Sequence, residues 1–213
     1  MKRSSDRIRT THTGSLHRPD SLARLVFDKE DRKPVDPAAL DREIRAATVE
    51  VLRRQVEAGV DVVSDGEMTK PSFVTYVNDR LKGFDAEHAL GPAGFLPKDL
   101  AEFPSLLPRV FHEEGHQHIR RLACTGPVAY ADVEAVHRDI ANLAAARREV
   151  AADEAFMTAV SPGTVDMVSP NQYYATSEEY HYAIADALRV EYEAITNAGL
   201  VLQVDCPDLA MGR

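Results

Sequence analysis

The sequence has no tryptophan, two cysteines and no long apolar run. Cys124 and Cys206 lie far apart, so they do not suggest a disulfide framework, and we expect a reducing, cytoplasmic environment. No stretch approaches the roughly 18 uninterrupted apolar residues that a membrane-spanning helix needs. Basic residues are fewer than acidic ones: the chain has 25 Lys and Arg and 34 Asp and Glu, which give a formal net charge of −9. Such an acidic chain, without a basic block, is a poor candidate for binding nucleic acid or anionic membranes.

The bulk composition is that of a globular protein. Hydrophobic residues make up 44% and charged residues 28% of a chain of 213 residues. This length suits one large domain better than two small ones, and we expect a single domain over residues 1–213.

Short apolar runs alternate with longer segments of helical periodicity. Residues 36–58 predict a helix, since Asp36 can cap it, Pro37 suits its first turn and Gly59 suits its end. The other expected helices cover residues 131–159 and 177–198, and the expected strands cover residues 7–16, 60–67, 121–128, 164–170 and 200–205. Strands and helices that alternate in this way predict a parallel sheet with helical crossovers.

The loops after these strands favour one α/β architecture over another. Residues 70–120, rich in Gly and Pro, interrupt the alternation, and we expect a long excursion there after the second strand. Five strands could complete a flavodoxin-like or other open sheet, whereas a TIM barrel needs eight strands and typically about 250 residues. However, functional-looking loops follow all the expected strands, which suits the mouth of a barrel better than a single crevice. We therefore expect an incomplete TIM (β/α)8 barrel of about five βα units.

Two of these loops carry candidate binding groups. In THTGS, residues 11–15, Gly14 lets the backbone approach a ligand and Ser15 offers a hydroxyl and an amide, although a plain turn would look similar. In SDGE, residues 64–67, Asp65 is ordinary turn chemistry. Glu67 is harder to explain as a turn residue, and its carboxylate could bind an ammonium group or orient a metal ligand.

Two further motifs could bind metal. In DCPD, residues 205–208, Cys206 is either a soft metal ligand or a small buried residue, and one cysteine does not make a zinc site. HEEGH, residues 112–116, matches the H-E-x-x-H pattern of zinc proteases. Prolines just upstream and Gly115 inside the motif disfavour the helix that such a site needs, so we predict a solvated turn and no zinc site. A metalloprotease is the least favoured alternative.

Four segments together resemble the cobalamin-independent methionine synthase family in its single-barrel form. The segments are RTTHTGSLHRP near the start, VVSDGEMTK after the second expected strand, LACTGPVAY after the third and LVLQVDCPDLA after the fifth. Their order and spacing match over about 200 residues. The family also contains epoxyalkane–coenzyme M transferases, which the short loops and the Cys-Pro-Asp segment resemble at least as much.

The resemblance implies thiol alkylation, as in methionine biosynthesis. In this family zinc binds a small-molecule thiol and presents a thiolate, which attacks the methyl group of a methyl-folate or an epoxide. By position, Gly14 and Ser15 would hold the carboxylate or equivalent anion of the thiol substrate, while Glu67 and Asp205 would hold the amino group of homocysteine. Methionine synthases usually have Glu where this chain has Cys206.

The resemblance also implies where the metal would bind. The family's zinc ligands are a His-x-Cys pair, a Glu and a further Cys, all beyond the fifth strand, and no His-x-Cys occurs in this chain. We therefore expect the N-terminal portion of a barrel, whether a truncated chain, a split gene product or an incomplete gene model. Alone it should neither bind catalytic zinc nor turn over. The alternative is a non-catalytic half-barrel that self-associates or pairs with a complementing chain.

Overall fold

The computed structural model describes residues 3–85, 102–106 and 122–211, which group into two compact units. The first unit comprises Met1–Phe73, Asp132–Ala159 and Val190–Val204. The second comprises Val74–Ala131, Val160–Arg189 and Asp205–Arg213. The HEEGH motif and most of the expected excursion lie outside the described residues.

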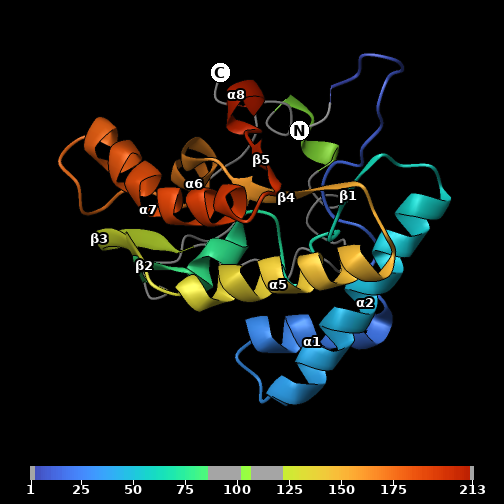
Figure 1. Cartoon of the computed structure of the whole chain (residues 1–213). Helices are drawn as coiled ribbons and strands as arrows, with labels where there is room; N and C mark the ends of the chain where they lie inside the picture. The colour runs from blue at the N-terminus through green and yellow to red at the C-terminus, as the bar shows by residue number, and fades with distance from the viewer. Residues whose placement is uncertain (1–2, 86–101, 107–121, 212–213) are drawn as a thin grey trace. The chain divides into compact units, whose positions relative to one another are not determined.

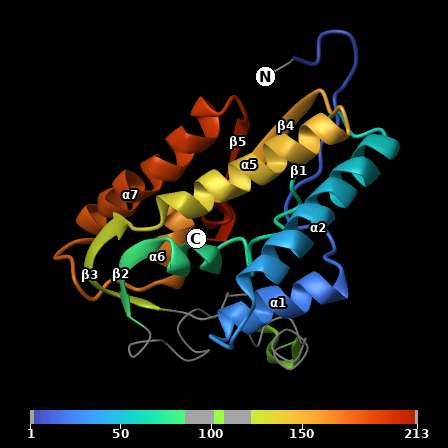
Figure 2. The same ribbon diagram turned by 60° about the horizontal axis from the view of Figure 1, so that its bottom comes forward.

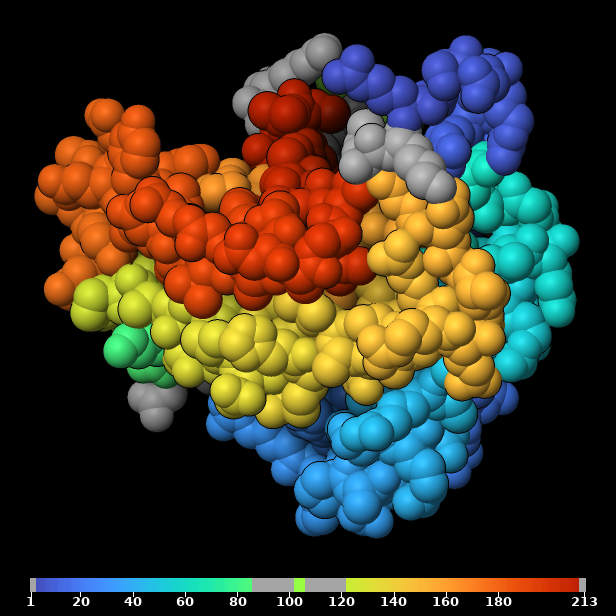
Figure 3. Space-filling view, viewed as in Figure 1, coloured from blue at the N-terminus to red at the C-terminus, as the bar shows by residue number. Residues whose placement is uncertain are grey.

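The first unit contains a sheet with the strand order β1-β4-β5 and helices packed beside it (Figure 1). Its strands are β1 (Val62–Ser64), β4 (Glu154–Val160) and β5 (Val201–Asp205), and its helices are α1 (Asp20–Glu30), α2 (Pro37–Glu57) and α5 (Val133–Glu149). Strand β1 pairs with β4 in parallel, with Val63 opposite Ala155. Helix α2 packs against α1 and α5 (Figure 2), and the atoms of α5 lie directly against α2 in the space-filling view (Figure 3).

Local sequence explains why α2 forms where it does. The Asp36 side chain accepts a hydrogen bond from the Ala38 N–H at 3.0 Å, and Pro37 occupies the first turn. The helix ends before Gly59, whose φ of +81° is a left-handed conformation that favours glycine. Its buried face is a stripe at helical spacing made of Ile44, Ala47, Thr48, Val51, Leu52 and Gln55. The helix expected over 36–58 is therefore confirmed.

The second unit is built around an antiparallel pair. Strand β2 (Leu81–Asp85) pairs with β3 (Ala123–Tyr130), and the unit also holds the 3₁₀ turns η1 (Thr75–Asp79) and η3 (Pro104–Leu106) and the helices α6 (Pro162–Val168) and α8 (Asp208–Met211). At Gly83 the two strands come so close that a Cβ would lie 2.7 Å from the Pro127 carbonyl oxygen. Helix α7 (Ser177–Asn197) contributes residues to both units and matches the helix expected over 177–198.

Three of the expected strands need correction. Residues 164–170 are not a strand, because Ser161 caps α6 through a 3.1 Å hydrogen bond from the Thr164 N–H and Pro162 occupies its first turn. The helix expected over 131–159 stops at Glu149, and β4 follows it. Strand β3 pairs antiparallel with β2 instead of joining the parallel sheet, and residues 7–16 contribute only an isolated bridge from Thr11 to Val62.

These corrections change the expected strand set but not the fold class. The chain is α/β with a parallel β1–β4 pair and covering helices, as expected. The interpretation that a loop at the mouth of one barrel follows every expected strand is wrong at residues 125–127, which lie in an antiparallel strand, and at 169–170, which follow a helix.

Candidate functional site

The loop that follows β1 has an unusual backbone. Gly66 and Glu67 both adopt a left-handed conformation, with φ values of +62° and +59°. The Oδ1 atom of Asp65 accepts a hydrogen bond from the Glu67 N–H at 3.0 Å and so closes the turn. A left-handed glutamate is uncommon and costs energy, and such residues cluster at functional sites. The loop therefore holds Glu67 in a position that the rest of the unit must stabilise.

The Glu67 carboxylate is almost fully buried and receives a hydroxyl at each oxygen. Its residue is 1% exposed. The Ser15 hydroxyl donates to Oε2, and the Thr158 hydroxyl, from β4, donates to Oε1 at 3.0 Å. Ser15, in contrast, is exposed. Because both neighbours donate, Glu67 is an acceptor on both sides, and Ser15 marks the side from which a ligand could reach it.

A buried lysine and a half-buried arginine support this loop. Lys70, which is 2% exposed, donates from Nζ to the Thr158 carbonyl oxygen at 2.6 Å and to the Thr158 Oγ1 at 3.2 Å. Arg18 donates to the backbone carbonyl oxygens of Glu67, at 2.7 Å, and of Lys70. These bonds tie the segment before α1, the loop after β1 and strand β4 together within the first unit.

Burial shapes the titration of this cluster. It lowers the pKa of the Arg18 guanidinium below its ordinary value, an effect that the nearby Glu67 and Asp65 charges oppose. It raises the pKa of the Asp65 carboxyl, while the Lys70 charge acts in the opposite direction. In both cases desolvation disfavours the charged form more than the neighbouring charges favour it.

The segment carrying Gly14 and Ser15 lies beside the Glu67 loop. The Leu16 N–H donates to the Gly66 carbonyl oxygen at 3.0 Å, and Gly14 has a φ of +80°. Among the described residues, the backbone N–H groups of Gly14 and Ser15 make no hydrogen bond. Two unused amides next to an acceptor carboxylate can bind the opposite ends of a zwitterion, the amides taking its carboxylate and Glu67 its ammonium.

The structure thus brings Gly14, Ser15 and Glu67 together, while Asp205 belongs to the second unit, so its convergence with them stays a prediction. The Asp205 carbonyl oxygen accepts from the Ser161 N–H at 3.0 Å. Cys206 is half-buried and forms no disulfide. Asp208 accepts from the hydroxyls of Ser161 and Thr164, each at 2.6 Å, and so fixes the start of α8 against α6.

Sequence reasoning missed Thr158, Lys70 and Arg18. Lys70 and Arg18 lie inside the segments VVSDGEMTK and RTTHTGSLHRP, close in sequence to Glu67 and Ser15. This closeness in sequence could have identified them as candidate site residues. Thr158 carried no such signal, because its strand was interpreted as part of a helix.

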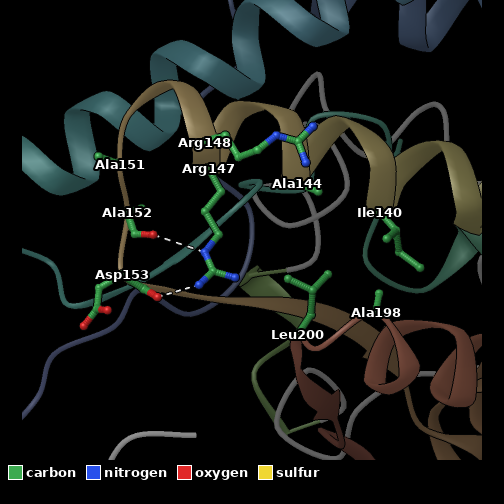
Figure 4. Close-up of a pocket in the computed structure, with 9 residues that line it drawn as sticks. All are labelled: Ile140, Ala144, Arg147, Arg148, Ala151, Ala152, Asp153, Ala198 and Leu200. Carbon is green, nitrogen blue, oxygen red and sulfur yellow. Dashed lines mark hydrogen bonds between the residues drawn. The ribbon is translucent and has the colours of Figure 1, made fainter.

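A separate hollow of about 500 Å³ lies in the first unit at the amino end of β4 (Figure 4). Arg147 crosses it and donates to the carbonyl oxygens of Ala152, at 3.1 Å, and Asp153, at 2.5 Å. Both bonds fix the connection from α5 to β4. This connection lies at the amino end of β4, whereas Thr158, which contacts Glu67, lies in the carboxyl half of the strand. We therefore assign Arg147 a structural role.

Neither a metal centre nor a membrane span is found in the part of the chain that the structure describes. Its His, Cys, Asp and Glu residues form no group of three or more that could hold a metal ion. None of its helices is both long enough and apolar enough to cross a bilayer.

Comparison with known proteins gives a consistent result. No family model matches the chain. It is 28% identical over 200 residues to the methionine synthase of Sulfolobus acidocaldarius, covering 93% of this chain and 51% of that protein. The corresponding protein of Saccharolobus solfataricus is 25% identical over 201 residues, covering 94% and 53%. The chain is thus similar to methionine synthases over most of its own length. It spans about half the length of the curated relatives that it matches.

Two solved structures share the fold of this chain. A B12-independent methionine synthase from a Shewanella species, in complex with selenomethionine, superposes with a TM-score of 0.66 at 22% identity, covering 93% of this chain and 51% of that one. A putative B12-independent methionine synthase from Listeria monocytogenes gives 0.62 at 18% identity, covering 91% and 50%. The resemblance to the cobalamin-independent family stated from the sequence is confirmed.

Proposed function

We propose that this chain is the N-terminal portion of an incomplete TIM barrel and supplies the substrate-binding half of a thiol methyl- or alkyltransferase. Similarity to methionine synthases over 93–96% of the chain supports this proposal. So do the parallel β1–β4 pair and the position of Glu67, just beyond a strand end, where TIM barrels carry their active sites.

The observation that carries the proposal is the geometry around Glu67. The Glu67 carboxylate is 1% exposed and accepts a hydrogen bond from a hydroxyl at each oxygen, so it presents acceptor atoms that a ligand ammonium group would bind. Since Ser15 donates to Glu67, its hydroxyl oxygen is left to accept from the same ammonium group. The substrate carboxylate would then bind the amides of Gly14 and Ser15. A thiol amino acid such as homocysteine has both groups, and Asp205 is a proposed second acceptor for its amine.

The described residues do not fit a zinc site, because they form no cluster of three suitable ligands. In the proposal, the zinc that activates the thiol and the methyl-folate or other alkyl donor are bound by the complementary part of the barrel. The role of this chain is to bind and orient the thiol substrate by its amine and carboxylate.

The test is calorimetric titration of the purified chain with L-homocysteine and with 4-mercaptobutanoate, which lacks the amine. Wild type should prefer L-homocysteine, and Glu67→Gln should weaken its binding by roughly 10–100-fold, the equivalent of about 1.5–3 kcal/mol for a charge-assisted hydrogen bond. The matched control is Glu43→Gln, since Glu43 also accepts from a serine, Ser21, at 2.7 Å but on an exposed helix pair. Equal affinity of wild type and Glu67→Gln for L-homocysteine would remove the assigned role.

A further inference from the structure

Thr158 connects the buried Lys70 ammonium to the Glu67 carboxylate. Lys70 Nζ lies 3.2 Å from the Thr158 hydroxyl oxygen, which lies 3.0 Å from Glu67 Oε1. All three residues are at most 2% exposed and belong to the first unit. The contact therefore forms away from bulk water, where the direction of each hydrogen bond has a large effect.

The chemistry of the three groups fixes the direction of both bonds. An ammonium group has only donors, so the Thr158 oxygen must accept from Lys70. A threonine hydroxyl has a single proton, and among these three side chains Glu67 has the remaining acceptor, so the Thr158 hydroxyl donates this proton to Glu67 Oε1. Lys70 Nζ also donates to the Thr158 carbonyl oxygen at 2.6 Å, so the ammonium group cannot move away from Thr158 without losing two hydrogen bonds.

We propose that Lys70 and Thr158 are positioning residues that hold the Glu67 carboxylate in the orientation needed to select an amine-bearing ligand. Lys70 turns the Thr158 hydroxyl proton toward Oε1, and this bond leaves Oε2, beside the exposed Ser15, as the oxygen that meets the ligand. This inference rests on the proposed function for the identity of the ligand, but the orientation of Glu67 can be measured without one.

The functional test compares Thr158→Val with Thr158→Ser. Valine has nearly the shape of threonine but no hydroxyl, and serine restores the hydroxyl. The preference for L-homocysteine over 4-mercaptobutanoate, measured by calorimetry, should fall about 10-fold in Thr158→Val and return in Thr158→Ser. Lys70→Met should lose the preference as well.

The matched control is Thr48→Val. Thr48 is 2% exposed and donates to the Ile44 carbonyl oxygen at 2.8 Å inside α2. Thr48→Val therefore removes a buried threonine hydroxyl that does not contact Glu67. The preference should be unchanged in this variant. Where wild type prefers L-homocysteine, an unchanged preference in Thr158→Val, or a loss in Thr48→Val of the same size, would overturn the inference.

A crystal structure of Thr158→Val gives the readout that needs no ligand. We expect the Glu67 carboxylate to leave the position that it has in wild type, and an unmoved carboxylate would overturn the positioning role. If wild type shows no preference for the amine but the carboxylate moves in Thr158→Val, the proposed function fails while the positioning role stands.

Discussion

The Gln55 side chain, from α2, makes two hydrogen bonds to the backbone of β1, and its replacement should lower the free energy of unfolding. Its Nε2 donates to the Ser64 carbonyl oxygen at 2.8 Å, and its Oε1 accepts from the Ser64 N–H at 3.0 Å. Gln55 is 5% exposed and Ser64 is 2% exposed, so water cannot replace these bonds without entering the unit. Ser64 directly precedes the Glu67 loop, so the same two bonds anchor the candidate site.

Leucine at position 55 would fill similar space but leave the Ser64 N–H and C=O without the Gln55 amide. An unsatisfied buried polar group costs about 1–3 kcal/mol, so the loss should be roughly 2–5 kcal/mol. Whole domains are stable by only about 5–15 kcal/mol, so the effect should be easy to measure.

Guanidinium unfolding of Gln55→Leu, followed by circular dichroism, measures this loss. The control is Glu57→Leu, an exposed position near the end of the same helix, where the change in unfolding free energy should stay within about 0.5 kcal/mol. A loss below about 1 kcal/mol in Gln55→Leu would refute the reasoning, because the Ser64 groups would then have found other partners.

Three further variants test separate parts of the structure. Gly163→Ala should destabilise the chain by about 1–3 kcal/mol, because the added Cβ would lie 2.2 Å from Asp208 Oδ2 and displace a carboxylate that accepts two hydroxyl bonds; wild-type stability in denaturation would contradict this. Burial raises the pKa of Asp65, so its unfavourable charge appears as pH rises through the folded-state pKa. Asp65→Asn, which keeps the Oδ1 acceptor, should therefore be more stable than wild type at neutral pH but not below the ordinary carboxyl pKa, and lower stability at pH 7 would show that its charge is needed. Arg147→Met should lose about 1–3 kcal/mol of unfolding free energy with its two carbonyl bonds, and an unchanged denaturation midpoint would show that the connection from α5 to β4 does not depend on them.

The sequence predicted those features whose causes are local. The helix at 36–58 depends on a cap, a proline and a periodic stripe that are all visible along the chain, and the structure has α2 at these residues. Strand β4 was missed because Ala151 and Ala152, just before its start, continue the composition of α5. The turn between the two elements uses Ala151, at a φ of +54°, and not a glycine or proline that the sequence would have shown. The antiparallel pairing of β3 was missed because its partner β2 lies inside a segment without strand periodicity.

The candidate site was only partly predictable for the same reason. Gly14, Ser15 and Glu67 follow expected strands, and the motif resemblance gave them roles. The Thr158 contact with Glu67 joins positions 91 residues apart, so it depends on the tertiary pairing of β1 with β4. No local pattern could have shown that a lysine three residues after Glu67 turns inward toward a threonine of another strand.

A crystal structure of the chain with L-homocysteine tests the central claim most directly. We predict that the ligand's amino nitrogen lies within hydrogen-bonding distance of Glu67 Oε2 and the Ser15 hydroxyl, with its carboxylate on the amides of Gly14 and Ser15. A ligand bound elsewhere, or bound with its thiol toward Glu67, would contradict the account.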